Sequence, residues 1–587
     1  MLNIAINKEH ENDLKATWID VKKAYDSVEH DYLIDCLKSL SLPEWMLEFA
    51  KTLVLKWNLK IMLGKEEILR KKIHRGIIQG DSLSPLLFVL AIDPLSRRLN
   101  EKYPKVSVNM DEISHSTNHL LFIDDLKLLS KDTNTMKELV EETEKFFSGI
   151  GLEMNKKKSA TNTQECADKT ELLGNEGVYK YLGIIENNKS IVTRDAFKVV
   201  KDELMNRVEL LCRTKLNAKN LFRAINEYAI SLINYHIGLQ HLEPDDYKEL
   251  DLDIRKILVK NKVHLSPGCK ERLYLDRKEM GRGLHSVEHK SERMLLQHYE
   301  TLDNYKNTST RRAAILKVEE NNKTHLALIK PYLEAKYKTV NLNLETLQKV
   351  QTQRLIEDIA IKPTHDKLFR ARRNEMVDIK DSSIWLHKGN NKPTTEAYNC
   401  YVQDRNVYWN SKEVMCLHCN KTKRTVDHIA TKCDRMLGHD YTRRHNEVVR
   451  AIHLHCMNLY GFTKSKKIRS HSVQEVRENR NAEVRVDTRI KTDVLIKNNR
   501  PDIFIYDKKK NEITIIEVRI TCQDLLQQVE IEKKRKYDLL ANELGMIYKC
   551  RTKIVPYVMT WDGVVTRHHK RYVKELKIYT TLEAYIQ

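Results

Sequence analysis

The sequence predicts a multidomain α+β protein, because strand-like and helix-like segments occupy different regions of the chain. Short apolar runs that end in aspartates stand near both ends, at Asp20 and Asp124 on the amino-terminal side and near Asp502 on the carboxyl-terminal side. Between them, residues 191–390 interleave charged and apolar residues at helical spacing. With 587 residues, of which 41% are hydrophobic, the chain is long enough for several domains with ordinary cores.

The first strand signal is an apolar run that ends in Asp20, and the second is the run 120–129, which carries Asp124 and Asp125 where paired strands would turn back. A lone Asp-Asp pair is more often a turn. Three carboxylates placed close together, however, are costly unless divalent cations neutralise them, and a pair of metals is common in phosphoryl transfer. Magnesium prefers such oxygen ligands. The two runs therefore predict a magnesium site of the polymerase type.

Three further segments follow the same order along the chain. Residues 76–88 form a glycine-flanked loop that runs into a helix, where glycine lets the backbone approach a nucleotide closely. Residues 151–155 precede three lysines at 156–158, and residues 179–184 close the series.

In this order the five segments resemble motifs A to E of the reverse transcriptases of non-LTR (LINE-type) retrotransposons, over roughly residues 14–190. The resemblance implies a right-hand polymerase palm in which Asp20, Asp124 and Asp125 hold two Mg²⁺ ions. Residues 1–190 would form this palm. Because Met1 lies only nineteen residues before Asp20, we expect the fingers subdomain to be missing and the copy to be truncated at its amino terminus.

The same resemblance implies the roles of the nucleotide-binding residues. Tyr25 would lie under the incoming sugar and exclude a 2′-hydroxyl, while Gln79 and Gly80 would line the template and nucleotide pocket. Lys158 would lie near the triphosphate, where a cation offsets the charge that develops on the leaving group.

Residues 191–390 are predicted to be helical, with runs at 196–216 and 221–242 that fit a thumb clamping a primer duplex. Helical bundles of any purpose share this pattern, so the assignment rests on position along the chain. Residues 388–393 are predicted to link this region to the next.

Most of the 11 cysteines are isolated, but one group has metal-ligand spacing. Cys416, Cys419, His428 and Cys433 give C-x2-C-x8-H-x4-C, which predicts a zinc knuckle within residues 400–440. Scattered free thiols are the alternative, and His418 and His439 are rival ligands. We prefer His428, because His418 lies between two cysteines that already bind the metal.

The last segment, residues 441–587, holds a second candidate magnesium site. Two strand runs joined by a charged turn present Asp502 and Glu517 at one end of a hairpin, an arrangement typical of metal-dependent nucleases. The pattern resembles the restriction-like endonucleases of the PD-(D/E)XK type, except that Arg519, a poor base, replaces the expected lysine. In the related endonucleases the lysine comes from the next helix, predicted at 523–544, where Lys533 and Lys536 are the candidates.

Arg443, His445 and Asn446 resemble the Arg-His-Asn segment with which this type of domain begins in the family, where it would bind DNA phosphate or orient the site. Asp487 and Asp493 are further possible contributors. The order palm, helical thumb, small zinc knuckle and α/β restriction-like endonuclease resembles the site-specific non-LTR elements.

This order implies an RNA-directed DNA polymerase (a nucleotidyltransferase) joined to a metal-dependent DNA endonuclease. The endonuclease would nick target DNA, and the polymerase would then copy template RNA from dNTPs, by target-primed reverse transcription. The net charge of +20, from 102 Lys+Arg against 82 Asp+Glu, agrees with a nucleic-acid partner. No apolar run approaches the ~20 residues that span a bilayer, so we expect a soluble protein made in the cytoplasm and acting in the nucleus. The alternatives are a non-polymerising, nucleic-acid-binding remnant and an active nuclease joined to an inactive palm.

Overall fold

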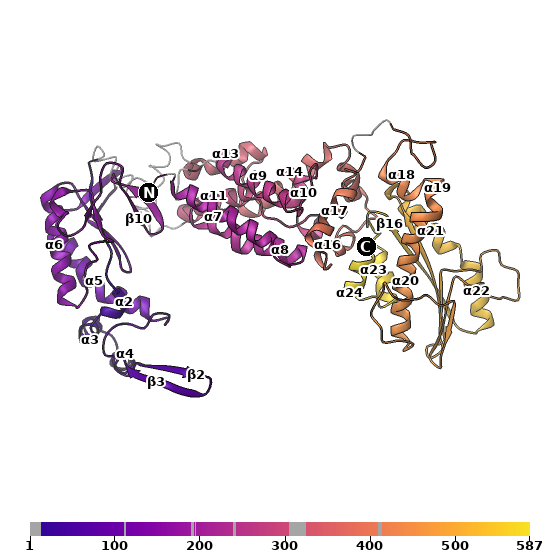
Figure 1. Ribbon diagram of the computed structural model, residues 1–587, viewed down its shortest axis with the longest axis horizontal. Coiled ribbons are helices and arrows are strands. Elements are labelled where there is room, and N and C mark those ends of the chain that lie inside the picture. Colours follow the sequence, from indigo (N-terminus) through magenta and orange to yellow (C-terminus); the bar gives the residue numbers. More distant parts are fainter. Residues whose placement is uncertain are drawn as a thin grey trace. The chain divides into compact units, whose positions relative to one another are not determined.

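The computed structural model describes residues 13–110, 113–189, 193, 195–238, 242, 244–304, 325–408 and 414–587 (Figure 1). It forms two compact units. The first unit comprises Met1–Lys201, Tyr235–Glu243 and Met294–Lys336, and the second comprises Asp202–Asn234, Pro244–Arg293 and Tyr337–Gln587. In the described part of the chain, no helix is long and apolar enough to cross a membrane.

A five-stranded sheet with the order β6-β7-β1-β8-β9 is the centre of the first unit. Its strands are β1 (Lys15–Ile19), β6 (His119–Phe122), β7 (Asp125–Ser130), β8 (Ala160–Thr161) and β9 (Glu171–Leu172). The predicted hairpin at 120–129 is confirmed, with β6 antiparallel to β7. Strand β1 also runs antiparallel to β7, with Ile19 opposite Leu126. This register places Asp20, the residue after β1, beside the turn that begins β7.

Helices cover one face of this sheet (Figure 1). Helices α5 (Ser84–Lys102) and α6 (Thr133–Gly149) lie against the strands, α3 (His30–Lys38) packs on α5, and α4 (Glu44–Leu55) packs on α3. The short helix α2 (Ala24–Ser27) contributes Ala24 to the same core. Leu126 and Leu128 of β7 pack with Phe88 of α5 and Leu139 of α6 in the largest core of the unit. Helix α6 begins at Asp132, whose side chain accepts a hydrogen bond from the Thr135 N–H at 2.8 Å.

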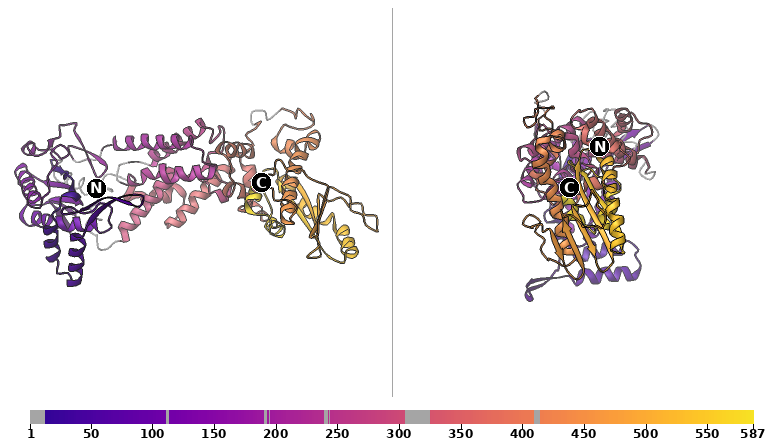
Figure 2. Two further views of the ribbon diagram at one scale, coloured as in Figure 1. Left: turned by 60° about the horizontal axis from the view of Figure 1, so that its bottom comes forward. Right: turned by 90° about the vertical axis from the view of Figure 1, so that its right-hand side faces the viewer.

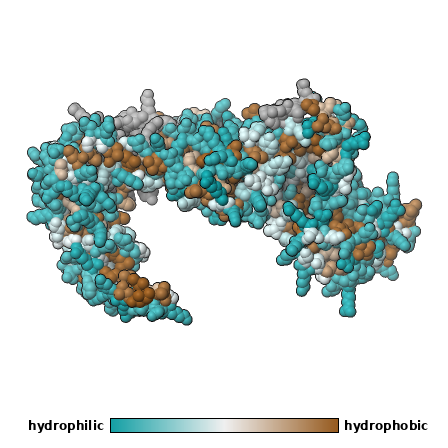
Figure 3. Space-filling model, in the orientation of Figure 1, coloured by the Kyte–Doolittle hydropathy of each residue, from teal (hydrophilic) through white to brown (hydrophobic). Residues whose placement is uncertain are grey.

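Three two-stranded hairpins extend from the unit: β2 (Asn58–Leu63) with β3 (Glu66–Lys72), β4 (Val106–Met110) with β5 (Ile113–Thr117), and β10 (Val178–Tyr181) with β11 (Ile184–Asn187). The β2–β3 hairpin is exposed along both strands. Its exposed apolar side chains include Leu59, Ile61, Met62, Leu63 and Ile68. Figure 3 shows a hydrophobic surface, in brown, over this hairpin at its lower left.

A buried ion pair joins the β10–β11 hairpin to the opposite face of the sheet. Lys127 of β7 is fully buried, and its Nζ donates to Glu186 Oε2 of β11 at 2.6 Å. The Trp18 indole N–H donates to the same oxygen at 3.0 Å, and the Lys127 Nζ lies 4.9 Å from the centre of the Trp18 ring. Burial lowers the pKa of Lys127, while Glu186 opposes that shift. The pair therefore holds this hairpin against the strand that begins at Asp125.

Replacing Glu186 with alanine is expected to reduce the local unfolding free energy by about 3–5 kcal/mol, because the Lys127 ammonium would remain buried without its counter-ion. Amide hydrogen exchange of β1, β10 and β11 at increasing urea measures this free energy. The double variant Lys127→Met, Glu186→Leu is the control and should recover most of the loss. Equal exchange in Glu186→Ala and the wild type would contradict the assignment.

The second unit begins with a helical block. The predicted helix at 196–216 is α7 (Asp195–Cys212), which starts in the first unit and continues into the second. The run predicted at 221–242 is not one regular helix: α8 (Ala218–Ala224) continues as a π-helical turn, Ile225–Ala229, and a 3-10 segment, Ile230–Tyr235. The end of that run, residues 239–241, lies outside the described residues.

The described α-helices of this block between residues 244 and 403 are α9 (Pro244–Lys260), α10 (Lys270–Tyr274), α14 (Leu344–Ala360), α15 (Asp366–Phe369), α16 (Ile384–His387) and α17 (Pro393–Gln403). Helix α11 (Val287–Asn304) is divided between the two units, and α13 (His325–Tyr337) belongs to the first unit up to Lys336. Buried ion pairs fix the 270–283 segment to α17 and the residue that follows it. Arg272 lies 2.8 Å from Asp404, and Arg282 lies 3.1 Å from Glu396. All four side chains are almost completely buried, so these contacts define one packing arrangement for the block.

The carboxyl-terminal part is a sheet of order β12-β13-β14-β15-β16 between helices (Figure 2). Its elements are α18 (Val426–Thr431), α19 (Asp434–Met436), α20 (Thr442–Leu459), β12 (Val476–Glu478), β13 (Ala482–Val486), β14 (Ile503–Asp507), β15 (Glu512–Thr521), α21 (Leu526–Arg535), α22 (Asp538–Ile547), β16 (Arg551–Thr560), α23 (His569–Glu575) and α24 (Thr580–Ile586). Strands β15 and β16 are parallel, whereas the other neighbours are antiparallel.

The predicted β14–β15 hairpin is confirmed, but the single helix predicted at 523–544 is wrong. The chain forms α21 and α22 with a break at Lys536–Tyr537. The Tyr537 hydroxyl lies 3.0 Å from Glu517 Oε2 and 2.9 Å from the carbonyl oxygen of Arg500, so the break allows a buried tyrosine to reach the strand ends. Helix α20 packs on one face of the sheet and α22 on the other.

Candidate functional site

The three aspartates of the first unit gather at the end of β1 and the β6–β7 turn. Ile123, the first residue of that turn, has a left-handed φ of 57°, which is costly for a β-branched side chain. Partial burial raises the pKa of Asp125, and the negative charges of Asp124 and Asp20 raise it further. Asp124 and Asp20 therefore each lie close enough to Asp125 to repel its negative charge, a condition that bound cations would relieve.

Two polar residues that the sequence analysis left without a role hold Asp20. The Asn155 side-chain amide donates to Asp20 Oδ2 at 3.0 Å, and the Asn155 backbone N–H donates to the Asp20 carbonyl oxygen at 2.8 Å. The Asp20 N–H donates to Ser159 Oγ at 3.0 Å. Lys158 is exposed in the same turn, where its N–H donates to the Asn155 carbonyl oxygen. The turn thus orients the Asp20 carboxylate and exposes the Lys158 ammonium to solvent.

The predicted nucleotide-binding residues lie around Tyr25. Its ring stacks on Phe88 with 4.9 Å between ring centres, and its pKa is raised by burial and by the negative charge of Asp124. The loop that carries Gln79 and Gly80 packs against this segment, because the Ile77 N–H donates to the Tyr25 carbonyl oxygen at 2.6 Å. At Gly76, with φ 91°, a Cβ would lie 2.7 Å from the Asp26 carbonyl oxygen, so glycine is required for this approach.

Tyr179 of β10 also borders the aspartates, and the sequence analysis gave it no role. Its ring stacks on Trp18 at 5.4 Å between centres. Burial raises the pKa of Tyr179, and the charges of Asp20 and Asp125 raise it further. The hairpin that Lys127 and Glu186 anchor therefore places an aromatic ring beside the carboxylates.

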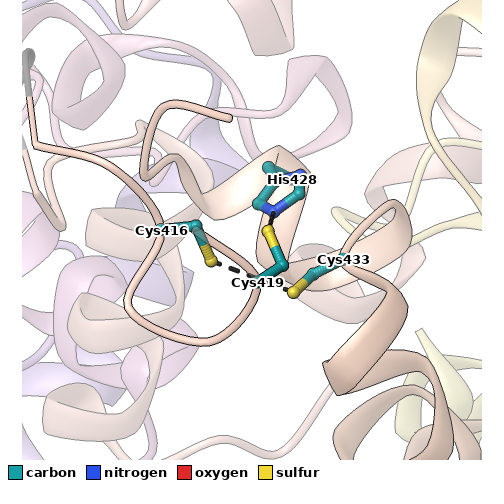
Figure 4. A group of neighbouring side chains, drawn as sticks. All are labelled: Cys416, Cys419, His428 and Cys433. Atoms are coloured by element: carbon teal, nitrogen blue, oxygen red, sulfur yellow. Dashed lines mark hydrogen bonds between the residues drawn. The ribbon is translucent and has the colours of Figure 1, made fainter. Parts of the chain in front are cut away.

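The four predicted zinc ligands of the second unit come together (Figure 4). The ligand atoms of Cys416, Cys419, His428 and Cys433 all lie within 4.8 Å of one another. His418 is exposed and does not belong to this group. Three thiolates and one imidazole with atoms this close fit tetrahedral Zn²⁺, which would fold a segment too short for a core of its own.

The zinc segment is attached on two sides within the second unit. Asp427, the neighbour of His428 on α18, accepts hydrogen bonds from Arg405 at 2.9 Å and from the Trp561 indole N–H at 3.1 Å. Arg444 of α20 donates to the carbonyl oxygen of Ala430 on the same helix. The helix that carries the candidate zinc ligand His428 is thus hydrogen-bonded to the helical block and to the sheet domain.

The carboxylates of the second candidate magnesium site lie just before β14 and on the neighbouring strand β15. Asp502 precedes β14 and accepts a hydrogen bond from the Val518 N–H of β15 at 2.7 Å. Glu517 is the residue before Val518, and its side chain is almost completely buried. Its oxygen Oε1 lies 3.0 Å from the Nζ of Lys533 and 2.7 Å from that of Lys536. Burial alone would raise the pKa of Glu517, but the two lysines keep it below its usual value.

The Arg-His-Asn segment contributes one direct contact to this site. His445 Nε2 lies 3.3 Å from Asp502 Oδ2, and Nδ1 of the same ring lies 3.2 Å from the Asn446 side-chain oxygen. Arg443 is exposed and pairs with Asp440. Arg519 lies away from the carboxylate pair's hydrogen-bond network, with its guanidinium 5.0 Å from the centre of the Tyr441 ring.

The further candidate acids differ in their surroundings. Asp487 pairs with Arg500 at 2.8 Å, and its N–H donates to the Asp502 carbonyl oxygen at 3.1 Å. Asp493 is exposed. Of these two residues, Asp487 is therefore the one connected to the carboxylate pair.

Comparison with known proteins assigns the first of these sites to a family. Residues 3–185 match the family model described as reverse transcriptase (RNA-dependent DNA polymerase). This region of the chain is therefore similar to reverse transcriptase domains. The match includes Asp20, Asp124 and Asp125, and it ends within β11.

The chain is also similar to proteins of R2 retrotransposable elements. The Pol polyprotein of the type-1 element R2 of Nasonia vitripennis is 27% identical over 280 residues, which cover 43% of this chain and 26% of that protein. The Pol polyprotein of the type-2 element R2DM of Drosophila melanogaster is 31% identical over 147 residues, covering 24% of this chain and 13% of that protein. The chain thus spans about a quarter or less of the length of these relatives.

Solved structures of telomerases also match the chain. A telomerase from Candida albicans in complex with a telomeric RNA fragment has 13% sequence identity and a TM-score of 0.26, covering 54% of this chain and 51% of that one.

Substituting Cys433 with serine is expected to lower zinc affinity by more than about 100-fold, because one thiolate of the ligand set is lost. Competition with a chromogenic chelator measures the zinc affinity, and elemental mass spectrometry measures how much zinc the purified protein contains. Cys550→Ser, a cysteine outside the group, is the matched control and should keep full occupancy. Wild-type affinity in Cys433→Ser would exclude the proposed ligand set.

Proposed function

We propose that the chain is an RNA-directed DNA polymerase with a DNA endonuclease, and that it carries out target-primed reverse transcription for a non-LTR retrotransposon. The observation that carries the polymerase assignment is the reverse transcriptase match over residues 3–185 together with the interacting aspartates Asp20, Asp124 and Asp125. The endonuclease assignment rests on Asp502, just before β14, and Glu517 of the adjacent strand β15, with Lys533 and Lys536 beside the glutamate.

In the polymerase step, the 3′-hydroxyl of a DNA primer attacks the α-phosphate of a dNTP and pyrophosphate leaves. Asp20, Asp124 and Asp125 would hold Mg²⁺, which when bound polarises the phosphate and favours the attacking alkoxide. Asn155 and Ser159 keep Asp20 in place, Tyr25 limits the space beneath the sugar, and Lys158 offsets charge on the leaving pyrophosphate. Template RNA and dNTPs are the substrates of this step.

In the nuclease step, Asp502 and Glu517 would hold Mg²⁺ at the target DNA strand, whose cleavage releases the 3′-hydroxyl used as primer. Lys536 is the nearer of the two lysines to Glu517, and Lys533 lies 0.3 Å farther at 3.0 Å. Either ammonium can neutralise charge that develops on the cut phosphate. Arg443, His445 and Asn446 would contact or orient the DNA, and the reaction would take place in the nucleus.

Replacing Asp124 with alanine is expected to reduce primer extension on an RNA template by at least about 100-fold and to leave nicking unchanged, since a metal ligand of one site is lost. Asp502→Ala should do the reverse. Extension of a primed RNA and nicking of supercoiled DNA, both with Mg²⁺, measure the two reactions separately.

The exposed acids Asp35 and Asp493 provide matched controls, and Asp35→Ala and Asp493→Ala should retain both activities. Loss of both activities in either single catalytic variant would contradict two separate sites. Nicking without extension in the wild type would favour a nuclease joined to an inactive palm, and absence of both would favour a binding remnant.

Replacing Tyr25 with valine is expected to weaken discrimination against ribonucleotides by about 10–200-fold, because the smaller side chain leaves room for a 2′-hydroxyl. The ratio of kcat/KM for dNTP and rNTP incorporation measures discrimination. Tyr25→Phe keeps the ring that stacks on Phe88 and should behave like the wild type. Unchanged discrimination in Tyr25→Val would mean that another residue excludes the hydroxyl.

A further inference from the structure

A cavity of about 570 Å³ lies in the carboxyl-terminal domain, on the face of the sheet that α20 covers. It is bounded by α20, by the carboxyl ends of β15 and β16 at Ile520 and Thr560, and by Tyr585 of α24. Trp561, the residue after β16, forms part of its wall. Its volume is within the range of small-ligand sites, so a phosphate or a nucleotide would fit.

The cavity is strongly basic. Its lining includes Arg443, Arg444, Arg450 and Arg469, against the single acidic side chain Glu447. Arg450 Nη1 donates to Glu447 at 2.6 Å. Arg443 and Arg469 are exposed, so their guanidiniums can reach an anion in the cavity.

Helix α20 connects this cavity to the carboxylate pair. Arg444 lines the cavity, and the next residue, His445, contacts Asp502 at 3.3 Å. Trp561, which also lines the cavity, donates its indole N–H to Asp427, the neighbour of the zinc ligand candidate His428. The cavity is therefore a built site whose walls are held by the same elements that position the nuclease residues.

We propose that this arginine-lined cavity binds a phosphate group of the DNA strand that is cut at Asp502 and Glu517. The identity of the strand rests on the proposed endonuclease function, whereas the affinity for phosphate rests on the arginines alone. Guanidinium groups bind phosphate oxygens in pairs, and Trp561 and Tyr585 offer aromatic surface for an adjoining base or sugar. The phosphate is either an internal phosphodiester of the strand or the 5′-phosphate of a cut end.

Two labelled single-stranded DNA 12-mers of one sequence, with a 5′-phosphate or a 5′-hydroxyl, distinguish these sources. Binding to the full chain is measured by fluorescence anisotropy without Mg²⁺, over a series of salt concentrations. Arg469→Gln and Arg450→Gln remove guanidiniums of the cavity. Arg480→Gln is the matched control, because Arg480 is exposed near the β12–β13 turn and does not line the cavity.

Both cavity variants are expected to bind about three- to tenfold more weakly than the wild type, and the slope of log K against log salt should fall by about 0.7 for each lost contact. DNA that binds elsewhere on the chain contributes equally to the affinity of every variant. The difference in affinity between a cavity variant and Arg480→Gln therefore measures binding at the cavity. Weaker binding only of the 5′-phosphorylated strand assigns the cavity to a cut end. Equal weakening of both strands assigns it to an internal phosphodiester.

Affinities and salt slopes in both cavity variants equal to those of Arg480→Gln would overturn the proposal. Nicking of supercoiled DNA by the same proteins separates this result from failure of the proposed function. If the wild type nicks DNA but the cavity variants bind normally, the nuclease stands and the cavity assignment fails. If the wild type does not nick but the variants bind weakly, the phosphate site stands without the nuclease.

Discussion

The antiparallel pairing of β1 with β7 is the constraint on which the first unit depends. Its register places Leu126 and Leu128 in the helix-covered core and Lys127 on the opposite face, where Glu186 receives it. A shift of one residue would exchange these faces, bury an unpaired ammonium among leucines and separate Asp20 from the β6–β7 turn. The same pairing therefore specifies the core, the anchoring of the β10–β11 hairpin and the meeting of the three aspartates.

The sequence predicted the elements that have strong local signals. The apolar runs before Asp20 and around Asp124 predicted paired strands, and the spacing of the cysteines predicted the group that includes His428. Helix α5 after the glycine-flanked loop likewise follows from apolar periodicity. In each case the residues that determine the element lie within one short segment of the chain, so the local sequence is sufficient to predict it.

The features that the sequence analysis missed depend on distant partners. Lys127 within an apolar strand gives no sign that it is buried, because its counter-ion Glu186 is 59 residues away. The break between α21 and α22 has no glycine or proline to announce it, and it follows from the contact of Tyr537 with Glu517. In the sequence, Asn155 and Ser159 look like ordinary turn residues, and their contacts with Asp20 are seen only once β1 lies beside their turn. Tertiary contacts decide all three.

The exposed β2–β3 hairpin has a consequence for handling the protein in solution. Its strands carry Leu59, Ile61 and Leu63 at the surface, and unpaired strand edges with apolar side chains are templates for aggregation. The charged side chains along the same hairpin, Lys60, Glu66, Glu67, Arg70, Lys71 and Lys72, act as gatekeepers by electrostatic repulsion between copies. Salt high enough to strip nucleic acid from this basic chain also screens that repulsion. Removing nucleic acid therefore requires high ionic strength, whereas keeping the protein from aggregating requires low ionic strength.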